Sequence, residues 1–195
     1  MKAKILLSLA LLPLLAGCAG YKSCSLNKLT PVPLHANKKI SFAAKSLDEA
    51  ESDLYLGRNV IKAGYTPIQI AIKNNSHKNL TFTHNEINMK TVPTDIVAEA
   101  VYQSIVARAL GYGIPSLFFL WPLLVPAIVD SCWASEANKQ LLHDYTRKSV
   151  RNQILSSNTS LDGLIFVGNN ELKNELIIDL VDEDTQEKIT CQTCL

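Results

Sequence analysis

Cysteine is the residue type in this chain whose spacing most clearly suggests chemistry. Cys191-x-x-Cys194 has the spacing of thiol redox motifs and of one half of a zinc site. A redox pair normally begins a helix, whose N-terminus stabilises the thiolate, whereas only Leu195 follows this pair. Zinc would need a second closely spaced pair, and the remaining candidates, Cys24 and Cys132, are far apart in the sequence. We therefore expect a structural disulfide between Cys191 and Cys194.

No other arrangement of reactive side chains matches a catalytic or ligand-binding pattern. Gly111-Tyr112-Gly113 lacks the third glycine and the downstream acid of a dinucleotide-binding loop. The histidines lack the HExxH spacing of a metal site; they are His35, His77, His84 and His143. The sequence therefore predicts no catalytic residue, no metal site and no cofactor, and we expect that the protein is not an enzyme.

The N-terminus combines a positive start, an apolar run and small residues. Two lysines precede the apolar run Ile5–Leu15, which is too short to span a bilayer, and Ala16-Gly17 follows it. This layout is typical of a secretory signal peptide, here residues 1–17.

The end of this signal has a more specific pattern. Leu15-Ala16-Gly17-Cys18 resembles the lipobox of bacterial lipoproteins. The resemblance implies that Cys18 receives a diacylglyceryl group and becomes the first residue, whose amine then usually takes a further acyl chain such as palmitate. Two or three acyl chains hold a protein on a membrane far more firmly than one. Membrane lipid at Cys18 is therefore the expected partner in the cell envelope, and Ala19 favours the outer membrane, facing the periplasm.

The charge balance excludes one class of partner. The 19 basic and 18 acidic residues give a formal net charge of +1. Without residues 1–17, which hold Lys2 and Lys4 and no acid, 17 basic residues face 18 acidic ones. A nearly neutral protein lacks the positive field that attracts nucleic acid. We therefore expect no nucleic-acid partner.

The rest of the chain predicts a tether followed by one domain. Residues 18–37 lack hydrophobic periodicity and predict a tether. The domain would extend over residues 38–195, with a helical insertion at about 94–148. Leu47–Asn59 begins with acidic residues and predicts a short helix.

Period-two alternation predicts the strands. It is clearest at Ile68, Ile70 and Ile72, and the polar turn Asn74–Asn79 then predicts a hairpin over Tyr65–Phe82. Further strands are expected at residues 40–44, 87–89, 153–155, 161–167, 176–181 and 188–191.

Strands on both sides of a helical block predict the α+β class. We expect an antiparallel immunoglobulin-like β-sandwich interrupted by an apolar helical insertion. Two segments resemble immunoglobulin-like envelope modules: PIQIAIKNNSHKNLTF is similar to their early hairpin, and TSLDGLIFV to a late strand. Over residues 55–167 the chain also resembles uncharacterised lipoproteins of chlamydia-like intracellular bacteria, through YLGRNVIKAGYTPIQI and LFFLWPLLVPAIVD. That resemblance implies no activity.

The insertion contains a long apolar run. Ala109–Val129 comprises 21 residues without a charge. As a straight helix it would measure about 31 Å, close to the thickness of a hydrocarbon core. Trp121 would then lie near the bilayer centre, and glycines and prolines interrupt the run, namely Gly111, Gly113, Pro115, Pro122 and Pro126. Three interpretations remain open: a helical subdomain with this run as its core, a helical hairpin that dips into the membrane, and a true span.

These observations lead to one functional expectation and one alternative. We expect a non-enzymatic, lipid-anchored envelope protein that contacts the membrane, or an unidentified envelope protein, through residues 109–129. The contacting residues would be Leu117, Phe118, Phe119, Leu120, Trp121, Leu123 and Leu124. The alternative is a thiol-active envelope protein that uses Cys191 and Cys194.

Overall fold

A computed structural model describes residues 21–34, 39–102 and 124–195. The chain divides into two compact units, which we describe separately. The larger unit, called the sheet domain below, comprises Ser23–Val101 and Leu142–Leu195. The other comprises Met1–Lys22 and Tyr102–Leu141.

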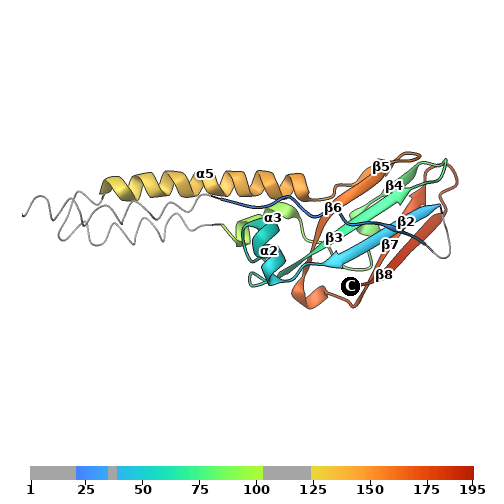
Figure 1. Ribbon diagram of the computed structural model, residues 1–195, viewed down its shortest axis with the longest axis horizontal. Coiled ribbons are helices and arrows are strands. Elements are labelled where there is room, and N and C mark those ends of the chain that lie inside the picture. Colours follow the sequence, from blue (N-terminus) through green and yellow to red (C-terminus); the bar gives the residue numbers. More distant parts are fainter. Residues whose placement is uncertain (1–20, 35–38, 103–123) are drawn as a thin grey trace, which may run out of the picture. The chain divides into compact units, whose positions relative to one another are not determined.

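The sheet domain contains two antiparallel four-stranded sheets (Figure 1). The first sheet has the order β1 (Val32–Pro33), β2 (Ile40–Ser46), β3 (Tyr65–Asn74) and β6 (Ser160–Gly168). The second has the order β5 (Gln153–Leu155), β4 (Leu80–Phe82), β7 (Glu175–Asp182) and β8 (Lys188–Cys194). Together with the helices they place the chain in the α+β class, as the alternation pattern predicts.

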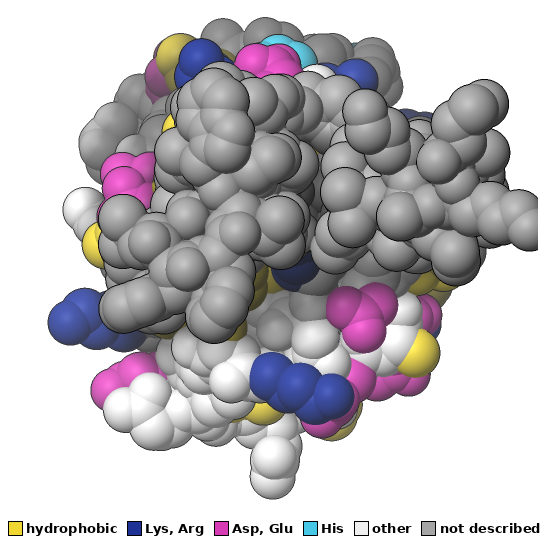
Figure 2. Space-filling model, turned by 90° about the vertical axis from the view of Figure 1, so that its left-hand side faces the viewer, with side chains coloured by type: hydrophobic (Ala, Val, Ile, Leu, Met, Phe, Trp, Pro, Cys, Tyr) yellow, Lys and Arg dark blue, Asp and Glu magenta, His cyan; other side chains and the backbone are white. Residues whose placement is uncertain are grey.

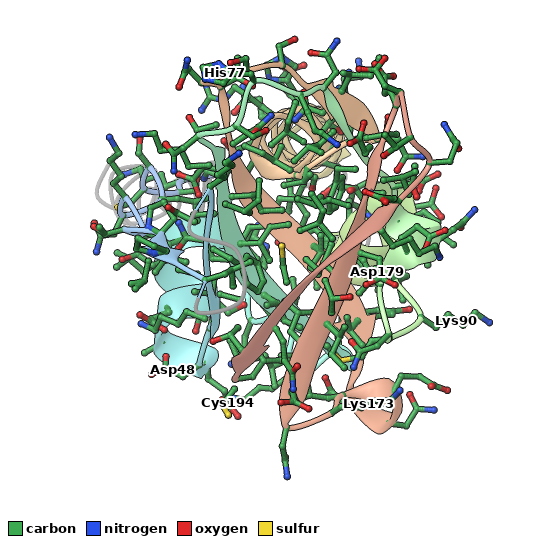
Figure 3. The ribbon with its side chains drawn as sticks, turned by 90° about the vertical axis from the view of Figure 1, so that its right-hand side faces the viewer. Asp48, His77, Lys90, Lys173, Asp179 and Cys194 are labelled. Carbon is green, nitrogen blue, oxygen red and sulfur yellow. The ribbon has the colours of Figure 1, made fainter. Side chains whose placement is uncertain are left out.

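The core of the sheet domain takes side chains from both sheets, which Figure 3 shows between the two layers. Ile68, Ile70 and Ile72 of β3 are fully buried in it, as are Leu176 and Ile178 of β7. Each buried side chain of this size contributes about 1.5–3 kcal/mol of transfer free energy. The period of two therefore identified the core-facing side of β3 correctly.

The hairpin predicted over Tyr65–Phe82 does not form. Its two strands, β3 and β4, belong to different sheets, and Asn74–Asn79 carries the chain from one sheet to the other. β3 pairs instead with β6 along nine residue pairs, from Tyr65↔Gly168 to Lys73↔Ser160. β4 has only three residues, so it could not satisfy a strand of ten. The turn composition predicted a reversal correctly but did not show which strand would be the partner.

The helices confirm the predicted helical segments where the structure describes them. α2 (Glu49–Leu56) begins with a capping box, in which Asp48 and Glu51 each accept a hydrogen bond from the backbone N–H of the other. α3 (Thr94–Ala100) and α5 (Leu124–Lys148) lie at the two ends of the predicted helical block. The described residues also contain two three-residue helices, η2 (His84–Glu86) and η4 (Asn169–Glu171).

The predicted strand at 87–89 does not form, and most of the apolar run cannot be compared with its prediction. In place of a strand at 87–89, Ile87 forms a single isolated bridge to Ile178. Residues 103–123, with most of the apolar run, lie outside the described residues. Among the helices that the structure does describe, none has the length and apolarity that crossing a membrane requires.

Candidate functional site

Three groups of the sheet domain, a carboxylate, a backbone carbonyl and a hydroxyl, surround the buried ammonium group of Lys148. Its Nζ donates to Asp144 Oδ2 at 2.6 Å, to the Tyr55 carbonyl at 2.5 Å and to Ser23 Oγ at 2.9 Å. The Ser23 hydroxyl in turn donates to Asp144 Oδ2 at 2.7 Å. An ammonium group has three protons, so each has an acceptor, and the buried charge is both paired and hydrogen-bonded. We call Ser23, Tyr55, Asp144 and Lys148 the junction.

The junction joins parts of the chain that are far apart in the sequence. Ser23 belongs to the N-terminal segment, Tyr55 to α2, and Lys148 to the last turn of α5. One residue later, Ser149 Oγ accepts a hydrogen bond from Thr94 Oγ1 at 2.9 Å, at the start of α3. In the sheet domain, α2 and α3 lie at the same end of the sheets (Figure 1). The chain coming from the N-terminus, the chain entering the insertion and the chain leaving it therefore converge at this end.

This arrangement corrects the predicted tether, residues 18–37. The described segment 23–34 is bound to the domain: the Cys24 N–H donates to the Leu54 carbonyl at 2.8 Å, and Gln69 Nε2 donates to the Asn27 carbonyl at 2.8 Å. Further along, Val32 pairs with Phe42 of β2. The segment lacks periodicity because it covers the outer face of the first sheet through backbone and polar groups rather than through an apolar stripe. The described segment 23–34 is therefore packed against the sheet domain.

The expected disulfide between Cys191 and Cys194 is also wrong, since both thiols are free. Both residues lie on β8, three positions apart, where side chains point to opposite faces and the Cα atoms are separated by about 10 Å. A disulfide needs Cα atoms within about 7 Å. Cys191 is buried in the core, whereas Cys194 is exposed (Figure 3).

The environment of Cys191 also argues against thiol chemistry. Burial, and secondarily the negative charge of Asp179, raise the pKa of the Cys191 thiol to about 12. Because the thiolate is the reactive form, this thiol is inert near neutral pH. Cys191 therefore acts as a small apolar core residue.

The three histidines that the structure describes do not form a ligand cluster. His84 lies with its Nε2 3.0 Å from the Val150 carbonyl and its ring edge-on to Phe82, while His77 and His143 are exposed. No group of three His, Cys, Asp or Glu residues in the described part of the chain could hold a metal ion. His35 lies outside that part.

A cavity of about 480 Å³ lies on the outer face of the first sheet, beneath the N-terminal segment. It is lined by Lys28, Leu29, Thr30, Pro31, Ala71, Ile72, Lys73, Ser160, Leu161 and Asp162. Asp162 Oδ1 accepts a hydrogen bond from Gln69 at 3.3 Å, so its carboxylate helps to hold the wall together. The lining offers two exposed lysines and no nucleophile paired with a base.

Most of the residues that the sequence singled out lie outside the part of the chain that the structure describes. Cys18 and the predicted contact residues Leu117, Phe118, Phe119, Leu120, Trp121 and Leu123 lie outside the described residues. Leu124 begins α5, and its side chain is not described. The junction was missed, although Asp144 and Lys148 have the i, i+4 spacing of a helical ion pair. That spacing usually indicates an exposed pair and gives no sign of burial.

No protein-family model, curated protein or solved structure matches this chain.

Proposed function

We propose that this protein is a non-enzymatic, lipid-anchored protein of the bacterial envelope. Its sheet domain holds the apolar segment 109–129 close to the membrane that carries the lipid of Cys18. That segment then contacts membrane lipid or a membrane-embedded protein. The observation that carries the proposal is the junction, since it brings the chain from the anchor and the chain from the insertion to one place.

Short sequence separations and direct hydrogen bonds support the proposal. Ser23, five residues after Cys18, lies 2.7 Å from Asp144, measured between Oγ and Oδ2. Asp144 lies three residues after Leu141, where the second compact unit ends. The hydrogen bond between Thr94 and Ser149 ties the other end of the insertion to the same region. The chain at Ser23 and the chain at both ends of the insertion therefore leave the sheet domain at one end.

The anchor is tested by mass spectrometry of the mature N-terminus. Acyl mass on Cys18, lost together with processing at that site in Cys18→Ser, is the expected result. An unmodified N-terminus at another position would remove the anchor from the proposal.

The insertion is tested with liposomes and a form of the protein that lacks residues 1–17 and carries Cys18→Ser, so that it has neither the signal peptide nor the lipid. We expect this form to bind liposomes, and joint replacement of Leu117, Phe118 and Leu120 by Asp to release it, because a charge deep in a bilayer costs about 2.5–3.5 kcal/mol. Ile154→Asp, at an exposed position of β5, is the matched control and should bind as before. If the triple variant unfolds, and the parent ignores liposomes, residues 109–129 form a helical core instead.

A further inference from the structure

We infer that the junction end of the sheet domain faces the lipid headgroups at close range, with α2 and α3 toward the bilayer and the Asn74–Asn79 connection away from it. The inference rests on the proposed lipid at Cys18 and goes further, because it assigns an orientation and a contact surface. The partner that contacts this surface is the lipid bilayer itself.

The first step concerns the length of the connection. Five peptide steps separate Cys18 from Ser23. Each residue of an extended chain covers at most about 3.6 Å, so Ser23 lies within roughly 18 Å of the lipidated residue whatever the conformation between them. A free tether as far as residue 37 would have allowed almost 70 Å by the same rule. Because hydrogen bonds hold segment 23–34 on the sheet domain, this segment cannot extend, and the largest possible distance between the domain and the lipid is much shorter.

The second step compares this length with the size of the domain. A compact domain of this size has a radius of gyration of about 14 Å and hence a diameter of roughly 35 Å. β3 alone, from Tyr65 to Asn74, extends over about 30 Å. Asn27 is bound halfway along β3, at Gln69, and Lys28–Pro31 lie beside Ala71–Lys73, so the N-terminal segment follows the strand away from the junction. The connection is too short for the domain to turn its far end to the bilayer while Ser23 stays in the junction.

The third step concerns the side chains at this end. Two apolar residues are exposed here: Leu54 of α2, whose carbonyl accepts a hydrogen bond from the Cys24 N–H, is 49% accessible, and Ile96 of α3 is 47% accessible. Single exposed apolar residues are ordinary on a protein surface, but here they lie on the end that the anchor holds near lipid.

Charge indicates which kind of bilayer this surface fits. The acidic residues of the two helices are Glu49, Glu51, Asp53, Asp95 and Glu99, and no basic residue lies within either helix. Figure 2 views the molecule along its long axis, and the residues drawn in colour include both acidic and basic side chains. The surface therefore fits a zwitterionic bilayer through apolar contact and does not fit strongly anionic lipid.

The test uses the acylated full chain in phosphatidylcholine vesicles that contain a lipid with a nitroxide on its headgroup. A fluorophore is attached to a single cysteine, either Leu54→Cys or His77→Cys, with Cys24, Cys132 and Cys194 replaced by Ser. Cys191 remains because it is fully buried. His77 is the matched control, since it is exposed in the Asn74–Asn79 connection (Figure 3).

We expect the nitroxide to quench the label at position 54 roughly threefold or more above the label at 77, because the short connection fixes the orientation. Ten Gly/Ser residues inserted between Lys22 and Ser23 would add about 35 Å of reach and should remove the difference. Equal quenching at the two positions in acylated, vesicle-bound protein would overturn the orientation and leave the anchor intact. A chain without acyl mass on Cys18 that fails to bind vesicles would overturn the anchor and, with it, the orientation.

Discussion

At the scale of single residues, Lys148 is a buried charge with an acceptor for each of its three protons. Its side chain is 6% accessible and that of Asp144 is 9% accessible, so the pair is desolvated on both sides. A buried ion pair is weak evidence of net stability, but removal of one partner leaves the other charge desolvated and less well paired. Without Lys148, Asp144 would keep the more exposed Arg147 as an ionic partner at 3.1 Å. Lys148 therefore links three parts of the chain, and its replacement should destabilise the packing of all three.

We expect Lys148→Met to lower the free energy of unfolding by about 3 kcal/mol, because Asp144 would lose its main partner in a desolvated site. The N-terminal segment that begins at Ser23 should also become more sensitive to protease. Urea denaturation and limited proteolysis measure these effects. Lys62→Met is the control, since Lys62 forms an exposed pair with Glu49 and should cost less than about 1 kcal/mol. Equal losses in the two variants would contradict the role of the junction.

Asp182 should make stability depend on acid pH. Its hydrogen bond with Lys78 is the main cause that lowers the pKa of this carboxyl from 3.8 to about 2, with help from the Asp184 and Thr185 backbones. The folded state therefore binds the proton more weakly than the unfolded state, so this stabilisation is complete above about pH 4 and is lost as the pH falls toward 2.

The melting temperature measured between pH 5 and about 2 tests this dependence. Asp182→Asn should flatten the curve over that range, and Lys78→Met should weaken the dependence because it removes the main cause of the lowered pKa. An unchanged acid slope in Asp182→Asn would assign the effect to other carboxyls.

At the scale of elements, the chain that leaves α5 packs tightly against β6. Val150 N–H donates to the Leu164 carbonyl at 2.9 Å, and Ser149 bridges to Leu164. This approach requires a residue without a side chain at position 163, because a Cβ there would lie 2.7 Å from the Lys148 carbonyl oxygen and 2.9 Å from Val150 Cγ2. The chain that follows the insertion can therefore pack against β6 only because residue 163 is a glycine.

Gly163→Ala should destabilise the domain by about 1–3 kcal/mol, because backbone atoms would have to move. Gly168→Ala, on the same strand, is the matched control: its added Cβ would meet the Asn170 side chain at 2.9 Å, which can rotate away. Urea midpoints compare the two. A cost at Gly168 as large as that at Gly163 would show that strand propensity, rather than the close approach, sets the effect.

At the scale of the whole molecule, the sheet pairing limits how the chain can be arranged around a membrane. β3 precedes the insertion and β6 follows it, yet the two strands are hydrogen-bonded partners in one sheet. A single membrane crossing between them would separate these partners. The two ends of the insertion therefore belong on the same side.

Reporter fusions at Asn75 and Asn170 should accordingly report the same compartment. Asn75 follows β3 and Asn170 lies in η4, which follows β6, so both positions belong to the sheet domain. A cell-impermeant label at cysteines in the same positions provides an independent measurement. Reporters on opposite sides would rule out this pairing in the cell.

The sequence by itself predicted the elements, because their signals are local. Alternation at Ile68, Ile70 and Ile72 located β3 and its buried face, and the acidic start of Leu47–Asn59 located α2. Only the tertiary structure decided the partners: β3 pairs with β6 rather than β4, segment 23–34 lies along the sheet, and Cys191 and Cys194 lie on opposite faces of one strand. The physical reason is that periodicity reports which face of an element is buried, whereas the choice of partner, and the burial of Lys148, depend on segments distant in the sequence competing for the same hydrogen bonds and the same apolar surface.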